Sequence, residues 1–353
     1  METVLTIIQG KGTLPREQAG RNIHYDDASL ANYKKVEQGD FIIHLRSFEG
    51  GLEMANEDGI VSPAYTILRC KKPHSSLFYE AYFHTDEFIN HILSKSVEGI
   101  RDGRQISYEA FKWLGLPYCD VSEQERIAQL FCTLSHRMEK QQQMVDALKK
   151  YKRGLFNQIF SAISKSSQCR KLRELVRVSG GKTPSMSNSL YWNGDIVWIS
   201  SKDMKSSRIS GSELKITNLA LNEMTLYHPG TLLLVARSGI LKHSLPLAIL
   251  EVDATINQDI KALQVHGCNA FYLYYAILSQ EDTIIRTLVK TGTTVQSLMM
   301  DSFLNIEIPT PDIDQQQRII DKLAKLEKYV EVQEKELSLL SQMRNGLLQQ
   351  LFI

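Results

Sequence analysis

Two stretches of the chain repeat one pattern of hydrophobic and polar positions. Residues 121–160 and 313–352 both carry apolar side chains at alternating steps of three and four residues. These side chains are Ile127, Phe131, Leu134, Met138, Val145, Leu148, Leu155 and Ile159 in the first copy, and Ile319, Leu323, Leu326, Val330, Leu337, Leu340, Leu347 and Leu351 in the second. The spacing is that of an a/d coiled-coil seam, so each copy predicts a long helix of roughly 60 Å.

The interruptions of this seam also repeat. Aligned at an offset of 192, the two copies are identical at 11 of 40 positions, where unrelated sequences of this composition would share roughly two or three. Gln141 and Gln333 occupy one polar seam position, and Lys152 and Arg344 occupy another. A single copy would be explained by an amphipathic helix on a globular core. Two matched copies favour packing of the helices against each other, with a buried Gln that fixes their register.

The predicted helices begin at recognisable signals. Ser122 with Glu125, and Asp314 with Gln317, have the spacing of a capping box. A small, polar linker is predicted after the first helix, at 161–168.

The sequence around the helices predicts mixed α and β structure. Apolar, β-branched runs predict strands, and more helical periodicity predicts helices. Strands are expected at 39–47, 59–70 and 106–118 before the first long helix and at 191–204, 230–238 and 303–312 after it, while helices are expected at 78–95 and 271–290.

The globular segments also match each other. Residues 39–47 align with 230–238 at an offset of 191, and 111–120 align with 303–312 at an offset of 192. The repeating unit is therefore a globular domain followed by a long helix. We predict an α+β fold with a pseudo-twofold internal repeat and an antiparallel pair of helices. The globular domains are predicted at 1–118 and 163–308, and the helices at 119–162 and 309–353. Because the globular sequences diverge strongly, they suggest two recognition surfaces with different targets.

Composition limits the possible functions. The chain has 353 residues, 23% of them charged, and a net charge of +1, so any nucleic-acid surface must be a local patch. No run approaches 18 apolar residues, and the first residues lack the layout of a signal peptide. The five cysteines are scattered and show no metal-binding spacing, which favours reduced thiols in a cytoplasmic protein.

No catalytic motif is convincing. GGKTPS (180–185) contains the end of a phosphate loop, but the required first glycine is replaced by Val176, and Pro184 interrupts the helix start that the motif needs. Glu251, Asp259 and Lys261 could be forced into a nuclease triplet, a pattern that is frequent by chance. GxGxxG after a strand, Asn-Pro-Pro and HExxH are all absent from the sequence.

Basic and polar residues gather at predicted strand ends and loops instead. The candidates for DNA binding are Lys182, Thr183, Lys202, Lys205, Arg237, Ser238 and Lys242 in the second globular part and Arg46, Ser47 and Arg104 in the first. Arg can bond guanine bidentately, and Lys mostly contacts phosphate. A single such residue is more often a solvated surface charge. Arg46 and Arg237 are the strongest candidates because the repeat places both at the same strand end.

These motifs together resemble the specificity subunit of type I restriction–modification systems. The resemblance rests on SEQERI…GLFNQIF and DQQQRI…GLLQQLF in the helices, and on GGKTPS…YWNGDIVWIS, ARSG (236–239), INQDIKAL (256–263) and VSPAYTIL (61–68) in the globular parts. It implies a non-catalytic protein with two target-recognition domains. Each domain would read one half of a split double-stranded DNA target, and the helices would set the gap.

The resemblance also implies partners. Two methyltransferase subunits would bind the helices and globular domains, and restriction/motor subunits would join for cleavage. S-adenosylmethionine, ATP and Mg²⁺ are expected on those partners and no cofactor on this chain. The seam residues considered for helix pairing or partner contact are Ile127, Leu134, Gln141, Leu148, Ile319, Leu326, Gln333 and Leu340. The alternative is a coiled-coil scaffold that binds only proteins.

One departure from the family pattern concerns the first globular domain. At an offset of 191, Met1 falls opposite Trp192, so this domain has no counterpart of GGKTPS. Its DNA contacts are therefore less well defined than those of the second domain.

Overall fold

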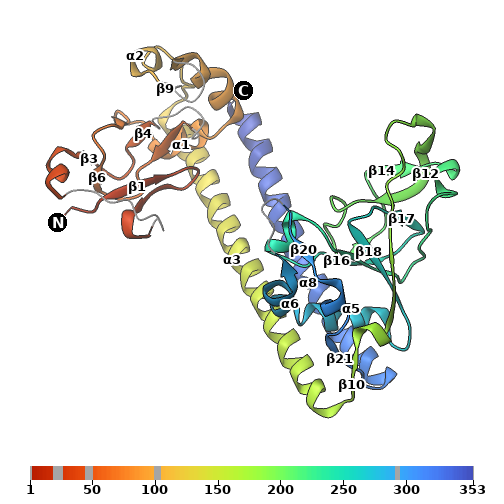
Figure 1. The fold of residues 1–353 in the computed structure, drawn as a ribbon. Coiled ribbons are helices and arrows are strands. Elements are labelled where there is room, and N and C mark those ends of the chain that lie inside the picture. Colours follow the sequence, from red (N-terminus) through yellow and green to blue (C-terminus); the bar gives the residue numbers. More distant parts are fainter. Residues whose placement is uncertain (1, 19–26, 44–50, 99–104, 291–294, 353) are drawn as a thin grey trace. The chain divides into compact units, whose positions relative to one another are not determined.

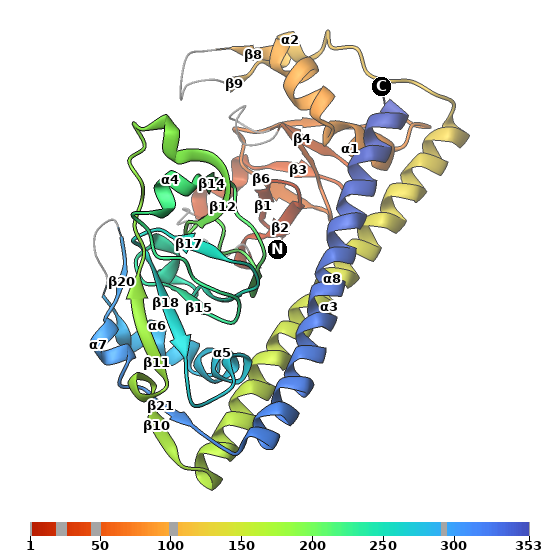
Figure 2. The ribbon, with the colours of Figure 1, turned by 90° about the vertical axis from the view of Figure 1, so that its right-hand side faces the viewer.

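The computed structural model describes residues 2–18, 27–43, 51–98, 105–290 and 295–352, and the chain forms two compact units. The first unit comprises Met1–Met144 and Gln333–Ile353, and the second comprises Val145–Val332. Two long helices, α3 (Val121–Ser166) and α8 (Ile313–Phe352), contribute a segment to each unit, and within each unit their segments lie side by side (Figures 1 and 2). The α+β class predicted from the sequence is confirmed.

The helix starts differ from the prediction by two residues. Asp120 Oδ1 accepts a hydrogen bond from the Glu123 amide at 3.0 Å, and Asp312 Oδ1 accepts one from the Gln315 amide at 2.8 Å. The predicted capping boxes at Ser122 and Asp314 are therefore wrong, because an acidic N-cap residue two positions earlier already satisfies the first free amides.

The predicted linker at 161–168 and the predicted end of the first helix at 162 are also wrong. Helix α3 continues to Ser166. The reason is packing, because Ile163 extends the apolar face and is buried with Phe156 and Phe160 in the core of the second unit. Tertiary burial outweighs the weak helix propensity of the serines in this segment.

The predicted seam is largely buried. Of the eight seam residues considered for helix pairing, Ile127, Leu134, Gln141, Ile319 and Leu340 are buried, whereas Leu148, Leu326 and Gln333 are half-buried. In the first unit, Arg137 pairs with Glu336 at 3.1 Å, and Gln141 Nε2 donates to Gln333 Oε1 at 3.0 Å. Residue numbers rise along one helix as they fall along the other, so the two segments run antiparallel.

The seam shifts by one residue near the helix ends. Leu155 and Leu347 are only half-buried, and Leu351 is exposed, whereas Phe156 and Leu348 are buried. A straight α-helix drifts by about 20° per heptad relative to a 3.5-residue repeat. Here the buried face turns from the partner helix toward the globular part of the same unit.

The globular part of the first unit consists of short strands and helices. Its strands are β1 (Leu5–Ile8), β2 (Gly12–Pro15), β3 (Lys34–Val36), β4 (Phe41–Ile43), β5 (Leu52–Met54), β6 (Gly59–Val61), β7 (Thr66–Leu68), β8 (Val97–Glu98) and β9 (Gln105–Ile106), and its α-helices are α1 (Ser76–Phe83) and α2 (Tyr108–Phe111). The pairings are β5-β4-β7, β1-β2, β3-β6 and β8-β9. Both faces of β4 are buried, because Phe41 and Ile43 pack in one cluster and Ile42 in another.

Three predictions for this part need correction. The strand predicted at 59–70 is two strands, β6 and β7. The strand predicted at 106–118 ends at Ile106, because Ser107 caps the helical turn α2 through its Oγ. The helix predicted at 78–95 ends at Phe83 and is followed by a π-helix at Glu87–Ile92 and a 3₁₀ helix at Leu93–Ser96.

The second unit contains a five-stranded sheet, β11-β18-β15-β16-β13, and a three-stranded sheet, β14-β12-β17. Its strands are β10 (Cys169–Lys171), β11 (Val176–Gly180), β12 (Trp192–Ile199), β13 (Arg208–Ile209), β14 (Leu214–Ile216), β15 (Leu232–Val235), β16 (Leu247–Leu250), β17 (Ala254–Ile256), β18 (Ile260–Val265), β19 (Val289–Lys290), β20 (Ser297–Leu298) and β21 (Glu307–Pro309), and its short α-helices are α4 (Asn218–Leu221), α5 (Ala270–Leu278), α6 (Glu281–Leu288) and α7 (Met300–Phe303). The helix predicted at 271–290 is thus two helices.

The continuous apolar run of β15 reflects burial on both faces of the five-stranded sheet. Leu232 and Leu234 pack in the cluster that includes residues of α5 and both long helices, and Leu233 and Val235 pack in a second cluster. A strand covered on both sides has no reason to alternate apolar and polar residues. In the part of the chain that the structure describes, no helix has the length and apolar character needed to cross a membrane.

Candidate nucleic-acid interface in the second unit

The sheet of the second unit brings several strand ends together. Strands β11 and β15 both pair antiparallel with β18, which lies between them, with Gly180 opposite Lys261 and Val235 opposite Ile260. The carboxyl ends of β11 and β15 therefore lie at the edge of the sheet where β18 begins.

The three residues before β18, 257–259, connect these ends through backbone hydrogen bonds. The Ala236 amide donates to Asp259 O at 2.8 Å. The exit of β11 is tied to the residue just before the turn, because the Lys182 amide donates to Ile256 O at 3.0 Å, and to the turn itself by the side-chain bond from Thr183 Oγ1 to Gln258 Oε1. The Asn257 amide donates to Ile199 O, the last residue of β12, at 2.9 Å. The segments that leave β11, β12 and β15 are thus all tied to this turn, which we call the 257–259 loop.

Five predicted basic residues lie on segments at this end of the sheet. Lys182 follows β11, Lys202 and Lys205 follow β12, and Arg237 and Lys242 follow β15. We call them the basic loop cluster. All five are exposed, and none of their side chains makes a hydrogen bond or an ion pair with the residues that the structure describes. Exposed cations on loops at one end of a sheet are suited to phosphate contacts.

The acidic residue between these lysines does not cancel their charge by pairing with them. Asp203 Oδ2 accepts hydrogen bonds from the Ser200 amide at 2.8 Å and from the Ser200 hydroxyl at 2.7 Å. Its Oδ1 accepts from the Glu213 amide at 2.9 Å. The carboxylate therefore fixes the backbone of the β12 exit, and the lysine side chains remain available.

The two remaining candidates of this unit are oriented by the fold. Thr183 Oγ1 donates to Gln258 Oε1 in the 257–259 loop. Ser238 is half-buried, and its Oγ accepts from the Ile240 amide as the cap of a 3₁₀ turn. We therefore expect a positioning role for Ser238 rather than a contact with a ligand. Gln258 was missed from the sequence, because an exposed glutamine in a turn has no distinguishing pattern.

The rejected catalytic motifs do not form sites. Residues 181–185 lie outside any helix or strand, so the GGKTPS segment does not lead directly into a helix as a phosphate loop does. Glu251 directly follows β16 and pairs with Arg208 at 3.0 Å. By the strand register it lies at the opposite end of the sheet from Asp259 and Lys261. The three residues of the nuclease triplet therefore do not converge.

In the first unit, the candidates Arg46, Ser47 and Arg104 lie outside the described residues. The described part holds a buried carboxylate that sequence reasoning missed. Glu53, 1% exposed, accepts hydrogen bonds from the Gly10 and Gly12 amides at 2.7 and 3.0 Å. His84 Nε2 lies 3.5 Å from its Oε2. The signal was a glutamate in a buried strand together with two glycines in the β1–β2 turn.

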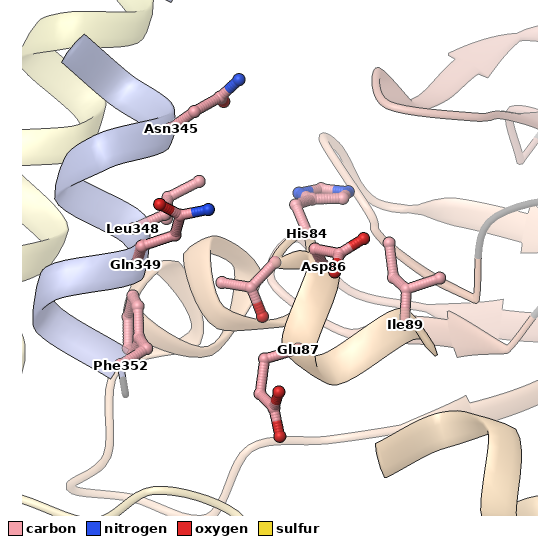
Figure 3. A pocket seen from close by; sticks show the side chains of 9 residues that line it. His84, Asp86, Glu87, Ile89, Asn345, Leu348, Gln349 and Phe352 are labelled. Atoms are coloured by element: carbon pink, nitrogen blue, oxygen red, sulfur yellow. The ribbon is translucent and has the colours of Figure 1, made fainter. Parts of the chain in front are cut away.

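His84 also lines a cavity of about 370 Å³ against α8 (Figure 3). Asp86, Glu87 and Ile89 line it on one side, and Asn345, Leu348, Gln349 and Phe352 line it from α8.

Each globular part is attached to its helix by the same hydrogen bonds. Gln124 Oε1 accepts from the Ser75 amide at 3.0 Å, and its Nε2 donates to Cys119 O at 2.9 Å. Gln316 makes the same pair of bonds: its Oε1 accepts from the Asn269 amide and its Nε2 donates to Pro311 O, both at 2.9 Å. We call these arrangements the glutamine latches.

A tyrosine supports each latch. Tyr79 donates its hydroxyl to Pro117 O at 3.3 Å, and Tyr272 donates to Pro309 O at 2.7 Å. Burial raises the pKa of both phenols, most strongly that of Tyr272. Both therefore remain neutral donors at neutral pH.

The second polar interruption of the helix seam differs between the units. Lys152 pairs with Glu327 at 3.3 Å, and Glu327 also accepts the Tyr275 hydroxyl at 3.0 Å. Burial lowers the pKa of Arg344, an effect that the nearby Glu80 opposes. Burial likewise raises the pKa of the Glu80 carboxyl. Both interruptions thus have electrostatic partners within their own units.

Comparison with known proteins identifies relatives of this chain. The family described as type I restriction modification DNA specificity domain matches residues 164–342. The specificity subunit of the type I restriction enzyme EcoR124I/EcoR124II of Escherichia coli is 32% identical over 252 residues, which cover 68% of this chain and 62% of the relative. The MjaIX specificity subunit of Methanocaldococcus jannaschii is 30% identical over 197 residues, covering 54% of this chain and 45% of the relative. The chain thus spans less than two thirds of either relative.

Solved structures show the same fold. The S subunit of a type I restriction–modification system from M. genitalium has a TM-score of 0.60 at 16% identity, with 91% of this chain and 84% of that chain covered. A chain from a study of the assembly and conformational transition of a type I system has a TM-score of 0.56 at 16% identity, with 90% and 83% covered.

Proposed function

Because the chain belongs to the type I restriction modification DNA specificity family, we propose that it is the subunit that selects the DNA target in a type I restriction–modification complex. The observation that carries this proposal is the basic loop cluster, five exposed cations on segments tied to the 257–259 loop. The names of the two relatives describe specificity subunits of the same class of enzyme and support it.

We propose a division of labour between the parts of the chain. The globular part of the second unit, within 163–308, reads one half of a split duplex target with Arg237 and its neighbours. The globular part of the first unit, within 1–118, reads the other half. The two long helices form an antiparallel coiled coil with a pseudo-twofold repeat and set the gap between the halves. The duplicated frame with divergent globular sequences supports this reading.

The chemistry belongs to partner subunits in this proposal. Two methyltransferase subunits bind the helices and globular domains and modify adenine with S-adenosylmethionine. Restriction subunits supply the ATP- and Mg²⁺-dependent cleavage. This chain contributes binding and orientation, and no catalytic group. The complex acts on DNA in the cytoplasm.

DNA binding separates this proposal from a scaffold that binds only proteins. The purified chain, with and without the methyltransferase subunits, is titrated with duplex DNA at several salt concentrations. We expect affinity to fall steeply as salt rises, since the lysines displace counterions from phosphates. Replacing Lys182, Lys202 and Lys205 with Ala reduces the slope of log affinity against log salt by about 3, approximately one per phosphate contact. No binding, or binding without salt dependence, favours the scaffold.

The spacing role is tested by shortening both helices in phase. Deleting 134–140 and 334–340 removes one heptad from each antiparallel segment of the first unit, together with both partners of the Arg137–Glu336 pair. The seam keeps its phase, and the helix pair becomes shorter by about 10 Å. At 3.4 Å per base pair, the gap in the recognised sequence should shrink by about 3 base pairs while both half-sites persist. An unchanged gap refutes the spacing role.

A further inference from the structure

The 257–259 loop carries one exposed side chain whose direction is set by a neighbouring segment. Gln258 is exposed, and its Oε1 accepts a hydrogen bond from Thr183 Oγ1. We propose that Gln258 reads one A·T base pair of the half-site from the major groove, and that Thr183 is its positioning residue. This inference rests on the proposed function and names a specificity-determining contact within it.

The backbone on both sides of Gln258 is held in place. Asn257 is 7% exposed, its amide donates to Ile199 O at 2.9 Å, and its Oδ1 accepts from the Asp259 amide at 3.1 Å. On the other side, Asp259 O accepts from the Ala236 amide at 2.8 Å. A side chain on such a turn needs little further ordering on binding, and this favours selective recognition.

Close packing brings Thr183 to the loop. A Cβ atom added to Gly181 would lie 2.0 Å from Ile256 O and 2.4 Å from Asn257 O. Only glycine therefore allows this strand exit to approach the 257–259 loop. The Lys182 amide then donates to Ile256 O at 3.0 Å, and Trp198 Nε1 donates to Lys182 O at 3.1 Å. The glycine-rich segment that resembled a phosphate loop thus serves to place Thr183.

The hydrogen-bonding groups left on Gln258 match adenine. The Thr183 hydroxyl uses one lone pair of Oε1, which leaves the second lone pair and both Nε2 hydrogens free. Adenine presents the N7 acceptor and the N6 donor in the major groove, so one carboxamide can bond both. Guanine presents two acceptors there and leaves Oε1 without a donor. The surrounding lysines contact phosphates in this arrangement.

The test uses the complex of the full chain with its methyltransferase subunits. Mapping modified adenines in cells that carry the wild-type complex gives the target sequence. Binding is then measured on duplexes that carry this target or single base-pair changes in it. Gln258→Ala is expected to lower the preference for one A·T pair by about ten- to a hundredfold and to leave the other positions unchanged. Thr183→Val should reduce the preference at the same position by a smaller factor.

Two further variants sharpen the result. Gln264→Ala changes an exposed glutamine on β18, the strand that follows the 257–259 loop, at the end paired with Arg177, and should leave every preference unchanged. Gln258→Glu retains only acceptors and should shift the preference at that position toward cytosine. A wild-type complex without a defined target refutes the proposed function itself. With a target in hand, unchanged preferences in both Gln258 variants, or equal weakening on all duplexes, overturn this inference.

Discussion

The glutamine latches give the sharpest stability prediction. Gln124 is 0% exposed and Gln316 is 2% exposed, and each bridges an amide at the start of a globular helix and a carbonyl just before a long helix. Gln124→Ala leaves the Ser75 amide and the Cys119 carbonyl without this partner. Ser75 and Cys119 are half-buried, so each group that loses its partner costs about 1–2 kcal/mol, the lower part of the range for a buried group, and we expect the first unit to lose about 2–4 kcal/mol.

Hydrogen exchange followed by mass spectrometry measures this loss locally on the full chain. The two units need not unfold together, and local opening reports the stability of each. Gln124→Ala should accelerate exchange in α1 by about 30- to 1,000-fold and leave α5 unchanged. Gln316→Ala should accelerate exchange in α5 and leave exchange in α1 unchanged.

The control is Gln143→Ala, which changes a glutamine on the exposed surface of α3 whose amide donates to Glu139 Oε1 at 3.1 Å. Its replacement should leave the exchange rates of both α1 and α5 within about twofold of the wild-type rates. If Gln124→Ala accelerates hydrogen exchange in α1 no more than Gln143→Ala does, the buried Gln124 amide does not hold the globular part to its helix. If α1 and α5 respond alike, the latches do not act separately on their units.

Three further predictions follow from individual contacts. Arg237→Ala should weaken discrimination in one half-site by about tenfold or more in duplex competition with the complex, whereas an equal loss on all sequences would identify a phosphate contact. Gln141→Leu combined with Gln333→Leu should melt at a higher temperature than either single change, because each single change leaves one amide unpaired in the seam; a double variant that melts below both singles contradicts this. Gly181→Ala should destabilise the second unit by about 1–3 kcal/mol because the added Cβ would collide with Ile256 O. Gly346→Ala in α8 should stabilise by about 0.5–1 kcal/mol, because the added Cβ meets no described atom within 4 Å beyond the local backbone of the helix; equal shifts in thermal unfolding would refute the packing argument.

The long helices could be predicted because their signal is local and repeated. The seven-residue spacing of Ile127, Leu134 and Gln141 is visible without knowledge of the fold. Their ends could not be placed from the sequence. Ser122 and Asp120 are both good N-cap residues, and the choice depends on where the preceding segment turns. The continuation to Ser166 depends on burial of Ile163 by distant residues.

The candidate interface was predictable only in part. Arg237 could be placed at a strand end because a continuous apolar run precedes it and the repeat supplies a second example. The convergence of Lys182, Lys202 and Arg237 requires the non-local order β11-β18-β15, which no short pattern contains. Gln258 becomes a candidate only when Thr183 is seen to hold it.

The positions that correspond in the two copies of the repeat are of two kinds, those bonded to backbone groups and those bonded to side chains, and sequence identity between the copies does not distinguish them. Gln124 and Gln316 make the same two hydrogen bonds in both units, and the partners in these shared bonds are backbone groups. Gln124 Nε2 also lies 3.1 Å from His74 Nδ1, a side-chain contact additional to the shared pair. Backbone partners do not change when a neighbouring side chain is substituted, so the latches tolerate divergence of the globular sequence. Lys152, by contrast, uses the side chain of Glu327, and the residue at the repeated position, 192 earlier, is Ser135. A frame held through backbone groups allows the loops of each globular part to vary without loosening that part from its helix, and the proposed function, in which the two parts read different sequences, requires this tolerance.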